Sequence, residues 1–68
     1  MSMGSVIGKN IKKYRLKMGL SQDKLAKLAN VTYTTLVKIE SGVNKNPTIK
    51  TLKKIADALG ITVNDLIY

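Results

Sequence analysis

The segment of residues 32–41 carries side chains suited to contacting the edges of nucleic-acid bases. Lys38 can donate hydrogen bonds to the O6 and N7 acceptors of guanine, or neutralise a phosphate. Thr34 offers a hydroxyl to a base edge and a methyl group to thymine, and Tyr33 can stack on a sugar, contact a thymine methyl or bind a phosphate. Val37 adds an apolar contact, best matched by thymine methyl groups. This set of side chains favours recognition of a DNA major groove.

A helical arrangement would place these side chains on one face. With successive residues about 100° apart around a helix, Leu36 and Ile39 fall together on one side, with Thr35 beside them. Thr34 and Lys38 cluster on the other side, with Tyr33 and Val37 adjoining. We expect the aliphatic side to be buried and the threonine and lysine side to be free. Two other interpretations stay open: Tyr33 and Val37 could pack on a neighbouring helix or partner, and Lys38 could be merely solvated.

A second group of polar residues could hold the DNA backbone. Gln22 opens an expected helix, where its side chain and the free backbone N–H groups would point toward a phosphate. A polar loop after residues 32–41 could make a second contact with the DNA backbone. The residues assigned to phosphate contact are Gln22, Thr32, Ser41, Asn44, Lys45 and Asn46, with Ser41 the weaker candidate.

Five helices would position these residues, because apolar positions recur at helical spacing and no strand-like alternation occurs. The expected N-caps are Ser5, Ser21, Thr32, Thr48 and Thr62, the last forming a capping box with Asp65. The expected helix ends are Gly19, Asn30, Gly42 and Gly60. The expected inward positions are Ile7, Ile11, Tyr14 and Met18, then Leu25, Leu28 and Ala29, then Leu36 and Ile39, then Ile49, Leu52, Ile55, Ala56 and Leu59. We therefore expect an all-α fold, with one domain over residues 6–68 and a flexible leader or cloning remnant over residues 1–5.

The composition narrows the classes of function. The chain has 68 residues, 12 Lys+Arg against 4 Asp+Glu, and a formal net charge of +8. Such an excess points to an anionic partner, nucleic acid first and an acidic membrane surface second. Cysteine and histidine are both absent, which removes thiol nucleophiles, imidazole bases and the usual zinc ligands. We expect no enzyme activity, no metal, no cofactor and no small-molecule ligand, and no apolar run approaches the roughly 20 residues that span a bilayer.

Three further positions concern the packing of the helices. Ala26 is expected where the second helix crosses closely over the third, so a larger side chain there should force the two apart. Gly8 is expected to weaken the first turn of the first helix. Arg15 and Glu40 could form a guanidinium–carboxylate pair that braces the first helix against the third.

Several short motifs together resemble the DNA-binding domains of phage repressors and Cro proteins, the XRE family of helix-turn-helix proteins. They are Gly19-Leu20-Ser21-Gln22, Leu25-Ala26, Val31-Thr32, Ile39-Glu40-Ser41-Gly42, Asn46-Pro47-Thr48, Leu52 and Ile55 to Ile61, within a match from about Ile7 to Ile67. The resemblance implies a five-helix bundle with a helix-turn-helix, which usually binds palindromic operators as a homodimer. It implies base contacts from Tyr33, Thr34 and Lys38, backbone contacts from Gln22, Asn44 and Lys45, and a salt bridge between Arg15 and Glu40. Asn30 stands where the family usually has glycine.

The hypothesis from the sequence is a sequence-specific, double-stranded DNA-binding transcriptional regulator of bacterial or phage type. It would act in the cytoplasm, at the nucleoid, as a homodimer with exposed Ile67 and Tyr68 as candidates for the contact between copies. The alternative is a protein-interaction module, such as an antitoxin or adaptor, in which DNA binding is secondary. A membrane-surface domain is weaker, because the lysines are spread over several helices.

Overall fold

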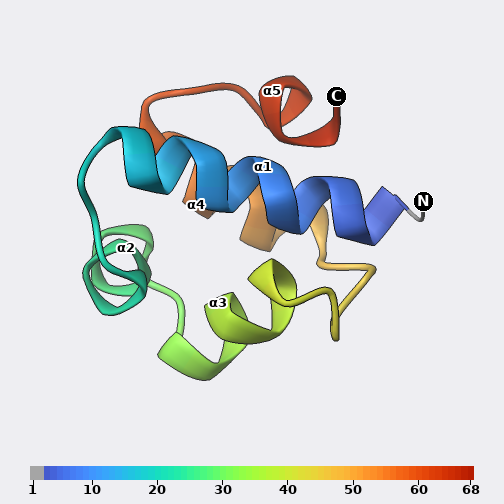
Figure 1. Cartoon of the computed structure of the whole chain (residues 1–68), viewed down its shortest axis with the longest axis horizontal. Helices are drawn as coiled ribbons and strands as arrows, with labels where there is room; N and C mark the ends of the chain where they lie inside the picture. The colour runs from blue at the N-terminus through green and yellow to red at the C-terminus, as the bar shows by residue number, and fades with distance from the viewer. Residues whose placement is uncertain (1–2) are drawn as a thin grey trace.

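The computed structural model describes residues 3–68, with side chains from residue 6 onward, and this part of the chain consists of helices joined by turns and loops, without strands. The helices are α1 (Met3–Lys17), α2 (Gln22–Ala29), α3 (Tyr33–Glu40), α4 (Ile49–Leu59) and α5 (Val63–Ile67). α1 runs across the molecule with α4 behind it, α2 and α3 lie below it, and α5 lies on its other side (Figure 1). The expected all-α bundle of five helices is confirmed.

Local hydrogen bonds explain where four of the helices begin. The side chains of Ser21, Thr32 and Thr48 each accept a hydrogen bond from the backbone N–H three residues later. Thr62 does the same, and the Asp65 carboxylate accepts from the Thr62 N–H at 3.0 Å, which completes the expected capping box. These four predicted N-caps are confirmed because each depends on residues within one turn.

The expected N-cap at Ser5 is wrong, because α1 already begins at Met3. No proline stands in this stretch to stop the helical pattern from extending toward the N-terminus. Of the leader predicted over residues 1–5, residues 1–2 lie outside the described residues, and residues 3–5 belong to α1.

The turn between α2 and α3 depends on Asn30. Its backbone has φ 57° and ψ 44°, the left-handed region that asparagine tolerates better than other residues with a side chain. Its N–H donates to carbonyls of the last turn of α2, and the N–H of Val31 donates to the Ala26 carbonyl oxygen at 3.0 Å. Asn30 therefore ends α2 as predicted, and its left-handed backbone turns the chain toward the start of α3.

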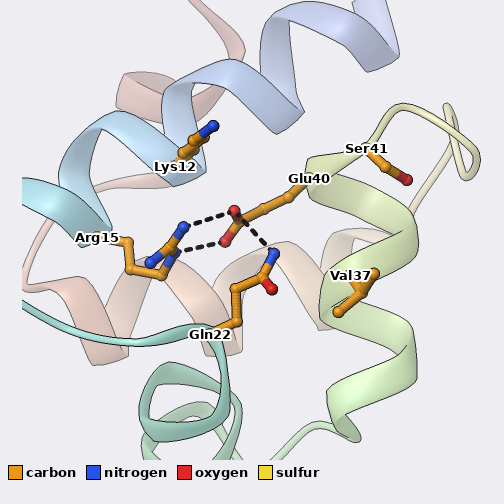
Figure 2. Close-up of a pocket in the computed structure, with 6 residues that line it drawn as sticks. All are labelled: Lys12, Arg15, Gln22, Val37, Glu40 and Ser41. Carbon is orange, nitrogen blue, oxygen red and sulfur yellow. Dashed lines mark hydrogen bonds and ion pairs between the residues drawn. The ribbon is translucent and has the colours of Figure 1, made fainter.

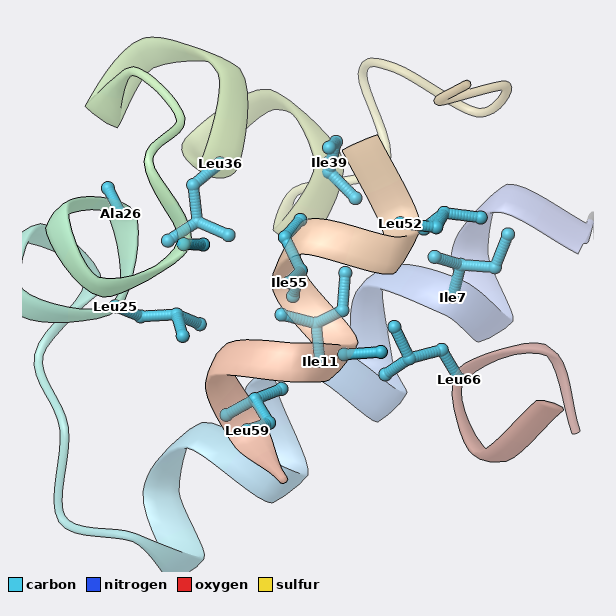
Figure 3. Close-up of a cluster of buried hydrophobic side chains, with 12 residues drawn as sticks. Ile7, Ile11, Leu25, Ala26, Leu36, Ile39, Leu52, Ile55, Leu59 and Leu66 are labelled. Atoms are coloured by element: carbon cyan, nitrogen blue, oxygen red, sulfur yellow. The ribbon is translucent and has the colours of Figure 1, made fainter. Parts of the chain in front are cut away.

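One hydrophobic core joins all five helices (Figure 3). Its largest fully buried side chains are Ile11, Leu25, Leu36, Ile39, Ile55 and Leu66. Ala26 is also buried, in agreement with its expected place at a close helix crossing. Most predicted inward positions are confirmed, and Tyr14 packs against this core while partly exposed.

Three predicted core positions are wrong, because Met18, Leu28 and Ile49 are each at least half exposed. Met18 follows the end of α1, where Arg15 takes the inward position instead. On α2, Ala26 and Leu28 lie at equal angles on opposite sides of the line through Leu25 and Ala29, and the neighbouring helices bury the Ala26 side. Ile49 is the first residue of α4 and lies beyond the edge of the core.

Gly8 permits α1 and α3 to approach closely. Gly8 is buried, and a Cβ atom there would lie 2.9 Å from the Glu40 carbonyl oxygen and closer still to that of Ile39. Real Cβ atoms essentially never come that near to backbone oxygen. The expectation that Gly8 merely weakens a helical turn therefore missed its main role, which is to let α1 cross the end of α3.

Candidate nucleic-acid interface

α3 presents the predicted polar face to the outside. Leu36 and Ile39 have no exposed surface, whereas Tyr33 is 51% exposed and Thr34 and Lys38 are exposed. Val37 is half-buried at the border between the two sides. The predicted orientation of α3 is therefore confirmed.

A hydrogen-bonded network fixes this helix relative to α1 and α2 (Figure 2). Arg15 donates from Nε to Glu40 Oε2 at 2.8 Å and from Nη2 to Glu40 Oε1 at 3.1 Å, which is the two-pronged geometry that suits a guanidinium and a carboxylate. The third nitrogen, Nη1, donates to the Leu20 carbonyl oxygen at 2.8 Å. The two charged side chains are only 9% and 3% exposed. The pair expected from the sequence thus ties the end of α1 to the end of α3.

Gln22 joins the same network. Its Nε2 donates to Glu40 Oε1 at 3.3 Å, so the first residue of α2 is linked to the last residue of α3. An amide nitrogen carries two N–H groups, and this contact uses one of them. This link could not be predicted from the sequence, because the two residues are 18 positions apart and glutamine pairs with many partners.

The loop after α3 is held against the end of that helix. The Asn44 N–H donates to the Lys38 carbonyl oxygen at 2.9 Å, and the Ser41 hydroxyl donates to the same carbonyl at 3.2 Å. The Asn44 side chain in turn accepts from the Asn46 N–H at 3.0 Å. These hydrogen bonds place the predicted loop residues beside α3, and Lys45 and Asn46 are exposed there.

Two of the predicted phosphate contacts have hydroxyls that are already engaged. The Thr32 hydroxyl donates to Thr35 Oγ1 at 2.7 Å, and that of Ser41 donates to the Lys38 carbonyl. A hydroxyl has only one hydrogen to donate. Either side chain would have to give up its present acceptor in order to donate to a phosphate.

An open hollow of about 320 Å³ lies between α1, α2 and α3. Figure 2 shows the residues that line it: Lys12 and Arg15 on α1, Gln22 on α2, and Val37, Glu40 and Ser41 on α3 and at its end. Lys12 lines the hollow and is not among the residues predicted from the sequence to contact DNA. The available signal was its spacing: it lies four residues after Gly8 and three before Arg15, on the same side of α1.

Neither a metal site nor a membrane-spanning helix is found in the described part of the chain. Residues 3–68 contain no group of three or more acidic side chains that could hold a metal ion. None of the five helices is long and apolar enough to cross a bilayer.

Comparisons with known proteins agree with this geometry. A family model described as helix-turn-helix matches residues 11–66. The transcriptional regulator SinR of Bacillus subtilis is 37% identical over 62 residues, which make up 91% of this chain and 56% of SinR. A crystal structure of SinR in complex with DNA has a TM-score of 0.88 and 37% identity, covering 91% of this chain and 98% of that one.

A third similar protein is the restriction-modification controller C.AhdI from Aeromonas hydrophila. Its structure has a TM-score of 0.87 and 28% identity, and the match covers 93% of this chain and 94% of that one. The match of the family model over most of the chain agrees with the exposed polar face of α3 and with the turn at Asn30. The chain belongs to the helix-turn-helix family of the phage repressor and Cro type.

Proposed function

We propose that the chain is a sequence-specific, DNA-binding transcriptional regulator whose α3 enters the major groove. The observation that carries the proposal is the exposed face of α3, on which Thr34 and Lys38 stand clear of the core in a chain of net charge +8. The SinR complex supports it, because a relative of the same fold binds DNA. The chain spans about half the length of SinR, so the proposal concerns the domain that the two share.

Each residue of the exposed face has a proposed contact. Lys38 donates to the O6 and N7 acceptors of guanine, and Thr34 offers its hydroxyl and methyl group to a neighbouring base. Tyr33, half exposed at the first turn of α3, contacts a sugar or a thymine methyl. Val37 is half-buried at the border of the exposed face of α3, so it can contact only a base that lies next to that border.

Contacts with the DNA backbone fix the position and orientation of the domain on the duplex. Gln22 keeps one N–H free for a phosphate while its other N–H donates to Glu40, so its side chain is already oriented before DNA binds. Lys45 and Asn46 are exposed in the loop after α3 and supply a second grip. We assign smaller contributions to Thr32, Ser41 and Asn44, whose side chains are engaged within the domain.

A homodimer on a palindromic operator would use two such faces. Two copies of α3 would then lie about 34–36 Å apart, one turn of the duplex. Tyr68 is 88% exposed beside the end of α5, whereas Ile67, which was also expected to be exposed, is half-buried; the two together are our proposed contact between copies. We place this activity in the bacterial cytoplasm, with no catalytic role.

The test is selection of bound duplexes from a random pool, followed by affinity measurements with Lys38→Ala. We expect the selected duplexes to contain mirrored half-sites. We expect Lys38→Ala to weaken binding by about 1–3 kcal/mol, with the loss concentrated at one base pair of each half-site, because the side chain reads a guanine there. Titration of labelled duplexes that carry single base changes measures this loss.

Lys53→Ala is the matched control. Lys53 is an exposed lysine of α4 that pairs with Asp57, so its removal changes the net charge equally without touching α3. A Lys38→Ala loss that is the same on every duplex would make Lys38 a phosphate contact. A folded protein that binds no duplex at low salt would overturn the proposal in favour of a protein-interaction module.

A further inference from the structure

The hollow between α1, α2 and α3 has one lining cation whose charge is not neutralised. Arg15 and Glu40 cancel each other, and Gln22, Val37 and Ser41 are uncharged. Lys12 therefore gives the six lining residues their net positive charge.

The position of Lys12 on α1 follows from its neighbours one turn away. Gly8 lies against the backbone of α3, and Arg15 binds Glu40 at the end of α3. Residues four before and three after a helical position share its face, so Lys12 lies on the side of α1 that borders α3. Its ammonium has no hydrogen-bond or ion-pair partner among the residues whose side chains the structure describes, 6–68.

The hollow adjoins the face of α3 that is proposed to enter the groove. Val37 belongs both to the lining of the hollow and to the border of that face. The walls of a DNA groove are its two phosphate backbones, so a backbone passes close to a helix that fills the groove. Gln22, which also lines the hollow, has one N–H that is not used by Glu40.

We infer that Lys12 binds a phosphate of the DNA backbone at the mouth of this hollow, which makes α1 the third helix of the DNA interface, after α3 and α2. A lysine ammonium is a compact charge on a flexible stem, and it suits a phosphate without demanding one fixed geometry. The inference rests on the proposed function, since the phosphate belongs to the duplex that α3 reads.

Two charge-removing variants of neighbouring residues test the inference. Lys12→Gln keeps most of the side-chain length and removes the charge, and Lys13→Gln makes the same change on another side of α1. Lys13 is the matched control because its ammonium lies over the Tyr14 ring, 5.4 Å from the ring centre, and because Lys13 does not line the hollow. Both positions are exposed, so both variants are expected to fold.

The measurement is duplex affinity as a function of salt concentration. One lost phosphate contact makes the slope of log affinity against log salt shallower by about 0.9. The advantage of the unchanged protein over Lys12→Gln should then shrink by about 3.5-fold between 50 and 200 mM salt. Lys13→Gln should leave the slope unchanged, and Lys12→Arg should restore it.

A scan of neutral methylphosphonate groups along the duplex locates the contact. At one position of each half-site, a neutral group should weaken binding by the unchanged protein. The same group should leave the affinity of Lys12→Gln for the duplex unchanged. Equal changes in slope for Lys12→Gln and Lys13→Gln would overturn the inference while the proposed function stands. Failure of the unchanged protein to bind any duplex would overturn both.

Discussion

Glu40→Ala is expected to lower the free energy of unfolding by about 3–5 kcal/mol, because it leaves a buried guanidinium without its carboxylate. Arg15 would keep only its hydrogen bond to the Leu20 carbonyl, and Gln22 would lose its acceptor on α3. A domain of this size is stable by roughly 3–10 kcal/mol, from about 0.05–0.15 kcal/mol per residue. The variant should therefore lose from about a third to all of the free energy of unfolding, which urea titration followed by circular dichroism would measure.

Asp23→Ala provides the comparison for Glu40→Ala. Asp23 forms an exposed pair with Lys27 at 3.2 Å, with both side chains more than 60% exposed, and such pairs contribute about 1 kcal/mol or less. Equal losses for the two variants would contradict a bracing role for the buried pair. Replacing both partners, as in Arg15→Met with Glu40→Leu, should recover much of the stability because no unpaired charge is left buried.

Gly8→Ala is expected to destabilise the fold by about 1–3 kcal/mol, the usual effect of forcing atoms into a packed interior. The added Cβ would meet the carbonyl oxygens of Ile39 and Glu40, which are backbone atoms and cannot rotate away. α1 and α3 would have to separate, and the contact between Arg15 and Glu40 would be strained with them.

The sign of the Gly8→Ala effect is the decisive feature. Alanine in the interior of an ordinary helix stabilises by about 0.5–1 kcal/mol relative to glycine, so helix propensity alone predicts a more stable protein. Chemical denaturation of Gly8→Ala, with Lys13→Ala as an exposed substitution in the same helix, separates the two expectations. A stabilised Gly8→Ala variant would show that α1 and α3 do not approach as closely as described.

Features that depend on a few neighbouring residues could be predicted from the sequence. The cap at Ser21, the capping box at Thr62 and the left-handed turn at Asn30 each follow from local hydrogen bonding or backbone preference. The orientation of α3 was predictable for a similar reason, because Leu36 and Ile39 share a side of any helix through that segment.

Features that depend on how helices cross were not predictable in this way. Leu28 and Ala26 both belong to α2, and only the placement of the neighbouring helices decides that the smaller residue is buried. The role of Gly8 requires the approach of α3, whose contacting carbonyls are more than 30 positions away. Arg15 and Glu40 were named from composition and family resemblance, whereas the link from Gln22 to Glu40 needed coordinates.

The exposed face of α3 is the surface that we propose binds DNA. The most direct measurement is a titration of the isotope-labelled protein with a selected duplex, followed by amide chemical shifts in NMR. We predict that the largest changes occur in residues 32–46 and at Gln22, with small changes on the outer side of α4. Large changes confined to α4 and α5, with α3 unaffected, would contradict the claim.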